Sequence, residues 1–176
     1  MKRMIITVAA AIISAAAAHA QTSSIVSGGT SFAIGSIAGT IQGTFDAPKG
    51  KFIFDPANLG TSQIDITIAA ASVFTDHTRR DSDAKGEKYL NVERFPTIRF
   101  TATKVAAKGH GYVATGTLRI KETTKTVALP FEAKRNGDGS YSLSSTFEIN
   151  RLDYGIGGKT FMLRNVATVS MDALAN

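Results

Sequence analysis

The sequence predicts an all-β protein, an antiparallel β-barrel of about eight strands with one short helix or loop insertion near residues 75–92. After Gln21, apolar and polar residues alternate with a period of two, which is typical of strands with one face in water. Runs rich in Gly, Asn and Pro separate the alternating segments and supply the turns. Such strands leave polar edges, and closure into a barrel removes them.

The first 20 residues are predicted to form a cleavable signal peptide. Lys2 and Arg3 precede an apolar run over residues 4–18, and Ala18-His19-Ala20 has the small-x-small pattern of a cleavage site. A buried N-terminal helix is the alternative for this alanine-rich run. Cleavage after Ala20 leaves one domain over residues 21–176, and we expect the mature protein in a bacterial periplasm.

Composition excludes several classes of protein. A chain of 176 residues suits a single domain, and the absence of cysteine excludes disulfides, thiol nucleophiles and iron–sulfur clusters. The net charge of +6 falls to +4 without Lys2 and Arg3, and the remaining basic residues are scattered among acidic ones. We therefore expect no nucleic-acid partner. The apolar run is shorter than the ~20 residues that span a bilayer, so we expect no stable membrane insertion.

Eight or nine segments are predicted as strands. They are residues 30–35, 38–46, 50–54, 62–74, 97–106, 110–120, 125–135, 140–150 and 163–174. In the fourth, Ile64, Ile66 and Ile68 share one face while Asp65 and Thr67 share the other. The later segments repeat this pattern with apolar faces formed by Ile98, Phe100 and Ala102; Val127, Leu129 and Phe131; Leu143, Phe147 and Ile149; and Ala167, Val169 and Met171.

Turn sequences join these strands. Asn136-Gly137-Asp138-Gly139 lies between two alternating segments and is a strong hairpin signal, because Gly and Asn accept a positive φ at low cost. Ala47-Pro48-Lys49-Gly50 and Lys108-Gly109-His110-Gly111 are turns of the same kind. The charged stretch from Thr75 to Val92 breaks the alternation. It predicts a loop with a short helix, either capping one end of the barrel or simply solvated.

Two apparent ligand loops do not meet their patterns. The stretch 155–160 ends like a phosphate-binding loop, but its first glycine would fall at Asp153 and a strand follows instead of a helix. The stretch from Asp81 resembles a calcium loop, but it has Lys85 at the fifth position and Val92 at the twelfth. We expect no metal and no cofactor.

A catalytic group is a second hypothesis. His77, with Asp76 and Asp81 close in sequence, predicts a small acid–base or metal group at the barrel mouth, and a plain surface histidine is the alternative. This group would make the protein an enzyme acting on a small or lipidic substrate. Arg151 and Asp153, two residues apart, are expected to form a structural ion pair.

All ten phenylalanines lie after residue 20, most of them on the apolar side of a strand. Eight-stranded barrels are either filled by side chains or wide enough for a small apolar ligand. The phenylalanines therefore indicate either a solid core or a greasy tunnel. A packed β-domain that acts through protein contacts stays open as a third hypothesis, as does a homodimer.

Four segments resemble the YceI-like family. Tyr89 to Phe100, with the sequence YLNVERFPTIRF, is similar to the family's "fDv-kyP-i-F" segment. Gly116 to Pro130 resembles "G-LTI-G-TK-V-L", Asn150 to Ile156 resembles "R-dFGi", and Ser72 to Asp81 resembles "aSi-T---rD". Their order agrees from about residue 30 to residue 174.

This resemblance implies an extended lipocalin-like barrel that holds an isoprenoid lipid, either a polyprenyl phosphate or a quinone-like chain, as a non-catalytic periplasmic carrier. The tunnel lining is then expected to comprise Phe45, Phe54, Ile66, Ile68, Phe95, Phe100, Leu118, Ile120, Phe131, Phe147, Ile149, Tyr154 and Phe161. A polar head group is expected at the mouth, where Arg94, Lys159 or Arg164 would meet a phosphate.

Overall fold

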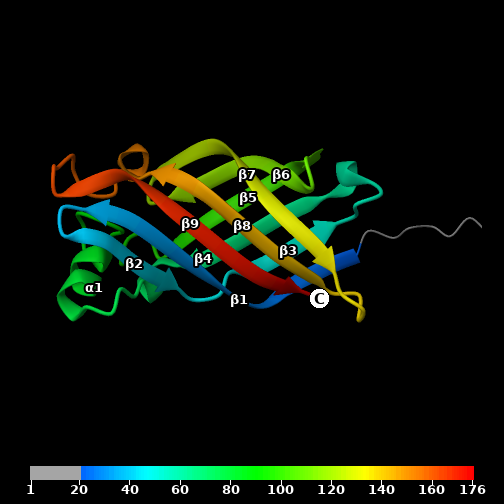
Figure 1. Cartoon of the computed structure of the whole chain (residues 1–176), viewed down its shortest axis with the longest axis horizontal. Helices are drawn as coiled ribbons and strands as arrows, with labels where there is room; N and C mark the ends of the chain where they lie inside the picture. Colours follow the sequence, from blue (N-terminus) through cyan, green and yellow to red (C-terminus); the bar gives the residue numbers. More distant parts are fainter. Residues whose placement is uncertain (1–20) are drawn as a thin grey trace, which may run out of the picture.

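The computed structural model describes residues 21–176; the predicted signal peptide and its cleavage site lie outside the described residues. The elements are β1 (Gln21–Ser36), β2 (Gly39–Phe45), β3 (Lys49–Phe54), η1 (Leu59–Thr61), β4 (Gln63–Ala69), η2 (Ala70–Ser72), α1 (Thr78–Lys85), β5 (Thr97–Lys108), β6 (Gly111–Ile120), β7 (Thr123–Arg135), β8 (Tyr141–Asn150), η3 (Arg151–Tyr154) and β9 (Leu163–Ala175). Figure 1 shows the strands winding obliquely around one elongated barrel.

Antiparallel pairing closes this barrel. β3 to β9 pair in chain order, and β1 completes the ring by pairing with β3 on one side and β9 on the other. β2 forms a hairpin with the second half of β1, from Thr30 to Ser36. The prediction of an antiparallel barrel of about eight strands is confirmed, since β1 and β3 to β9 form the closed ring and β2 lies beside it.

The boundaries of two predicted strands were wrong. The first strand spans 21–36 instead of 30–35, and its first four residues pair with β3. A register shift follows between Ile25 and Ser27. Just beyond it, only glycine fits at position 28, because φ is 152° and a Cβ would lie 2.2 Å from the carbonyl oxygen of Asp172. The predicted strand 62–74 ends at Ala69, where η2 begins. Beyond η2, Phe74 returns to pair with Thr44 at the outer edge of β2.

Aromatic side chains fill one end of the barrel. Phe52, Phe54, Tyr112, Phe131 and Tyr141 pack with ring centroids 4.8–6.4 Å apart, mostly edge to face. They come from β3, β6, β7 and β8, at the end where the C-terminus lies in Figure 1. We call this cluster the aromatic plug, because its rings pack together inside this end of the barrel.

The segment between β4 and β5 covers the opposite end of the barrel, where Figure 1 shows α1. Val73 and Leu90 are buried and belong to the hydrophobic core. The amide of Gly157, in the loop after η3, donates to the carbonyl of Lys88 and joins the two loops at this end. The short helix predicted near residues 75–92 is therefore present, in a segment that caps the barrel.

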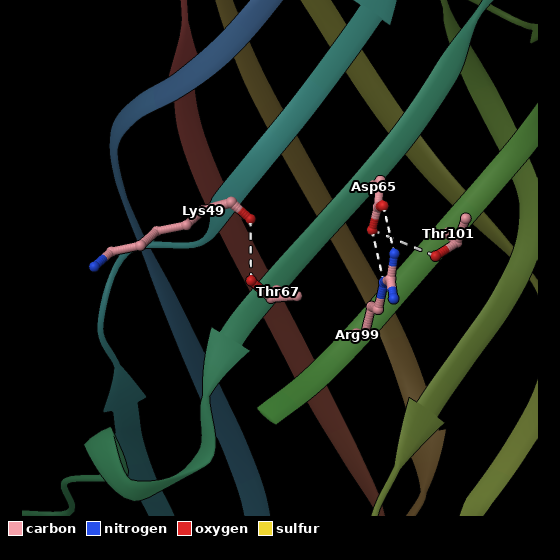
Figure 2. Close-up of polar contacts among 5 residues, drawn as sticks. All are labelled: Lys49, Asp65, Thr67, Arg99 and Thr101. Carbon is pink, nitrogen blue, oxygen red and sulfur yellow. Dashed lines mark hydrogen bonds and ion pairs between the residues drawn. The ribbon is translucent and has the colours of Figure 1, made fainter. Parts of the chain in front are cut away.

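The outer face carries the polar half of the alternation, as Figure 2 shows for β4 and β5. Arg99 donates two hydrogen bonds to Asp65, with Nε–Oδ1 at 2.8 Å and Nη2–Oδ2 at 2.6 Å. Thr101 and Thr67 lie on the same face. The pKa of Asp65 is lowered, chiefly because its charged form accepts these bonds from Arg99.

Candidate ligand-binding lumen

The barrel strands turn a continuous apolar face inward. Of the predicted lining residues, Phe54, Ile66, Phe100, Leu118, Ile120 and Tyr154 are buried in the core, and Phe45, Phe131, Phe147 and Ile149 pack partly buried against it. Ile68 and Phe95 are half-buried near the capped end of the barrel. Phe161 is 86% exposed on the loop before β9, so the structure does not place it in the lumen.

A small apolar cavity lies next to the aromatic plug. Its volume is about 50 Å³, and Phe52, Ile66, Phe100 and Leu129 contribute to its walls. Typical ligand pockets have volumes of about 300–1,000 Å³. Binding of a long chain therefore requires the lumen to widen.

One pair of adjacent strands separates along most of its length. β7 and β8 pair only from Glu132 to Arg135 and from Tyr141 to Ser144. Beyond this, the Ser145 hydroxyl donates to the carbonyl of Pro130 over 2.6 Å. The segments 123–130 of β7 and 145–150 of β8 have no register with each other. We call this stretch, in which the two segments are unpaired, the window.

Apolar side chains are partly exposed at the window. Val127, Phe147 and Ile149 follow the inward parity of their strands, and all three contact the core. They are nevertheless only half-buried, and they lie in the stretch where β7 and β8 are unpaired. An apolar chain entering from the side would meet these side chains first.

Two lysines, Lys121 and Lys125, contact the stretch from Asp153 to Gly155 at the capped end of the window. Lys125 has the inward parity of β7, and its Nζ lies 3.0 Å from Oδ2 of Asp153. Lys121, in the turn before β7, is buried and donates from Nζ to the carbonyl oxygen of Gly155 over 2.9 Å. Between these two acceptors lies Tyr154, whose pKa is raised by burial and secondarily by the charge of Asp153. Both lysines therefore hold η3 against the start of β7.

Arg151 organises the loop after η3. It is 3% exposed, and it donates to the carbonyl oxygens of Arg164, Ile156, Gly158 and Leu163. The predicted ion pair of Arg151 with Asp153 is wrong, because Asp153 pairs with Lys125 instead. The guanidinium fork suits several backbone acceptors at once, whereas a single carboxylate would satisfy fewer of its donors.

The predicted head-group candidates lie on the exposed surface. Arg94 lies over the Phe95 ring, 5.1 Å from its centroid, and Lys159 is exposed in the loop before β9. Arg164 packs against Gly35 on β1, so that a Cβ added to Gly35 would lie 2.7 Å from Cδ of Arg164. Sequence reasoning missed Lys121 and Lys125. The apolar residues alternating with Lys125 on β7 were the available signal for its inward side.

Two residues of the catalytic hypothesis, His77 and Asp81, have structural roles. Nδ1 of His77 accepts from the amide of Arg80 and caps α1. Oδ1 of Asp81 accepts from both the amide and the hydroxyl of Thr75, at 2.7 and 2.6 Å. Asp76 is exposed beside them. Within residues 21–176, no group of three or more His, Asp or Glu side chains has a geometry that could hold a metal ion.

A larger and more polar hollow of about 610 Å³ lies outside the lumen. Its floor includes the outward residues Ser31, Thr44 and Ser170 of β1, β2 and β9, and its wall includes Phe74 and Arg80. We regard the smaller apolar cavity as the candidate site, because it lies among the inward faces of the barrel strands. In the described part of the chain, no helix is long and apolar enough to cross a membrane.

The closed antiparallel ring and its inward apolar face define a lipocalin-like β-barrel protein. The chain belongs to the YceI-like family, whose domain model matches residues 16–175. The predicted family is therefore confirmed.

Relatives of known sequence support this assignment. A UPF0312 protein of Photorhabdus laumondii is 37% identical over 97 residues, which are 55% of this chain and 50% of the relative. A UPF0312 protein of Yersinia pestis is 36% identical over 100 residues, covering 57% of this chain and 51% of the relative. The chain thus matches about half the length of these relatives.

Solved structures share the fold. BcnA of Burkholderia cenocepacia has a TM-score of 0.79 at 21% identity, covering 85% of this chain and 96% of BcnA. The YceI protein of Campylobacter jejuni has a TM-score of 0.68 at 26% identity, covering 77% and 84%. A polyisoprenoid binding domain from Saccharophagus degradans, implicated in plant cell wall breakdown, has a TM-score of 0.67 at 12% identity, covering 88% and 97%.

Proposed function

We propose that this protein is a non-catalytic periplasmic carrier that holds an isoprenoid lipid in the lumen of its barrel. The observation that carries this proposal is the continuous apolar inner face, whose half-buried members Val127, Phe147 and Ile149 lie where β7 and β8 are unpaired. The fold shared with a polyisoprenoid binding domain agrees with this choice of ligand. The periplasmic location is proposed from the export pattern of residues 1–20.

The energetics favour a chain ligand. Burial of an apolar chain contributes ~0.8 kcal/mol per methylene, so several isoprene units supply a large gross free energy. Part of this is offset by ordering the flexible chain. A further part is needed to widen the cavity from about 50 Å³. The half-buried side chains at the window are the ones that can move with the least loss of packing, because one side of each is already open.

The first experiment is mass spectrometry of lipid extracted from the protein, expressed from the full chain and purified without detergent. We expect an isoprenoid lipid to copurify. The second uses a matched pair of variants on β7, because Val127 follows the inward parity and its neighbour Ala128 is exposed. Val127→Trp should abolish copurification and binding of added geranylgeraniol, whereas Ala128→Trp should leave both unchanged. Absence of lipid together with no binding of geranylgeraniol would overturn the proposal.

A further inference from the structure

We propose that Lys121 and Lys125 form the head-group site of the carrier and that this site selects a lipid ending in a phosphate. The proposal rests on the proposed function, because it assigns the polar end of a ligand whose chain occupies the lumen. Both lysines reach the stretch from Asp153 to Gly155, at the capped end of the window. A chain inserted through the window would leave its polar end beside them.

Lys121 has hydrogen-bond donors that the protein does not use between Gln21 and Asn176. Its residue is only 9% exposed, and its ammonium group makes one hydrogen bond among residues 21–176, to Gly155. An ammonium group has three donors. Two of its N–H bonds are thus left without a protein acceptor in the described part of the chain. An anionic oxygen at this position would supply acceptors for these two N–H bonds.

Lys125 forms a half-exposed ion pair with Asp153. Its side chain is 42% exposed, its partner Asp153 is 46% exposed, and such surface pairs have small net free energies. Lys125 can therefore leave Asp153 and bind a phosphate at a small cost in free energy. Lys125 lies opposite Leu118, a core residue on β6, so it stands where the apolar wall of the lumen ends.

The charge of the site decides between the two kinds of lipid head group. Lys121, Lys125 and Arg151 against Asp153 leave two net positive charges, because the neutral backbone carbonyls that Arg151 contacts do not cancel its charge. A phosphate monoester accepts several charge-assisted hydrogen bonds and neutralises this charge. A quinone carbonyl accepts bonds but carries no charge, so it would leave the lysines uncompensated.

The experiment measures the affinities of geranylgeranyl phosphate, geranylgeraniol and inorganic phosphate for the wild-type protein and four variants. Lys121→Met and Lys125→Met should each weaken binding of geranylgeranyl phosphate by about tenfold, since each removes a charge-assisted hydrogen bond. Their affinity for geranylgeraniol should stay within about twofold. Lys134→Met, which changes an exposed lysine on the same strand, should alter neither affinity. Asp153→Asn should raise the affinity for geranylgeranyl phosphate, because it removes the carboxylate that competes for Lys125.

The outcomes separate the two proposals. A wild-type protein that binds neither lipid overturns the carrier function and with it the head-group site. Equal losses for both lipids in the lysine variants, or no losses, overturn the head-group site while the carrier function stands. Inorganic phosphate binding as tightly as the phosphate lipid overturns the assignment to a lipid. If Lys121→Met does not fold by circular dichroism, Lys125→Met and Asp153→Asn carry the test with opposite expected signs.

Discussion

Ser145 on β8 donates a 2.6 Å hydrogen bond to the carbonyl oxygen of Pro130 on β7, at the point where these strands separate. In a strand, the N–H and the carbonyl of one residue point to the same side, so the nitrogen of Pro130 also faces β8. Proline has no N–H to donate. The regular ladder therefore stops here, and a side-chain hydroxyl makes the contact.

Replacing Pro130 with valine should narrow the window. The new N–H can donate to β8 and extend the ladder, so geranylgeraniol should dissociate more slowly in stopped-flow measurements. Ala128→Val is the matched control, because it adds a β-branched side chain on the same outer face without adding a donor. Equal dissociation rates for wild type and Pro130→Val would show that the window is not the route of exchange.

The aromatic plug should carry much of the stability. Phe54 is 2% exposed and packs against four other rings. Phe54→Ala should lower the free energy of unfolding by about 3–5 kcal/mol in urea denaturation. Phe161→Ala removes the same side chain from a position that is 86% exposed. It should change the free energy of unfolding by less than about 0.5 kcal/mol. Similar losses for the two variants would contradict the plug's role.

Arg151 should be needed for the loop between η3 and β9. Arg151→Met removes hydrogen bonds to four backbone carbonyls, those of Ile156, Gly158, Leu163 and Arg164, and should cost about 2–4 kcal/mol of unfolding free energy. Arg164→Met changes an exposed side chain in the same region and is expected to have little effect. Faster amide hydrogen exchange over residues 155–163 would locate the loss; unchanged exchange there would argue against this role.

The pH dependence of the Asp65 pair has a definite sign. The folded-state pKa of Asp65 lies below its ordinary value of 3.8, mainly because of the hydrogen bonds from Arg99. Its contribution to stability is therefore present above the unfolded pKa and is lost as pH falls through the folded pKa. The contribution should be small, because both side chains are about half exposed. Carbon-13 NMR titration of Asp65 should show its pKa rising in Arg99→Gln, and an unchanged pKa would contradict the assignment.

The alternation of Ile64, Ile66 and Ile68 was enough to predict β4, because burial of one face fixes which residues point inward. The turn at residues 136–139 likewise marked the β7–β8 hairpin. The first half of β1 was missed because its Ser- and Gly-rich sequence has no such alternation. Its register is set by partners from β3 and β9, which are distant in sequence.

The candidate site was harder to predict than the fold. Pro130 was visible in the sequence, but its effect depends on which neighbour its nitrogen faces. Lys121 stands in a two-residue turn, where a lysine is ordinarily solvated, and only the return of η3 across the barrel end buries it. Phe161 was predicted to line the tunnel, but it lies on the loop before β9 and is exposed.

The seam between β1 and β9 has a consequence for how the protein matures. Ser24 and Asn176 exchange both backbone hydrogen bonds, so the ring joins segments from opposite ends of the domain. Contacts between such distant residues make folding slow, because the intervening chain must be ordered before they form. The ring cannot be completed before residues 163–175 have been synthesised. The barrel therefore stays open between β1 and β8 until β9 has been made.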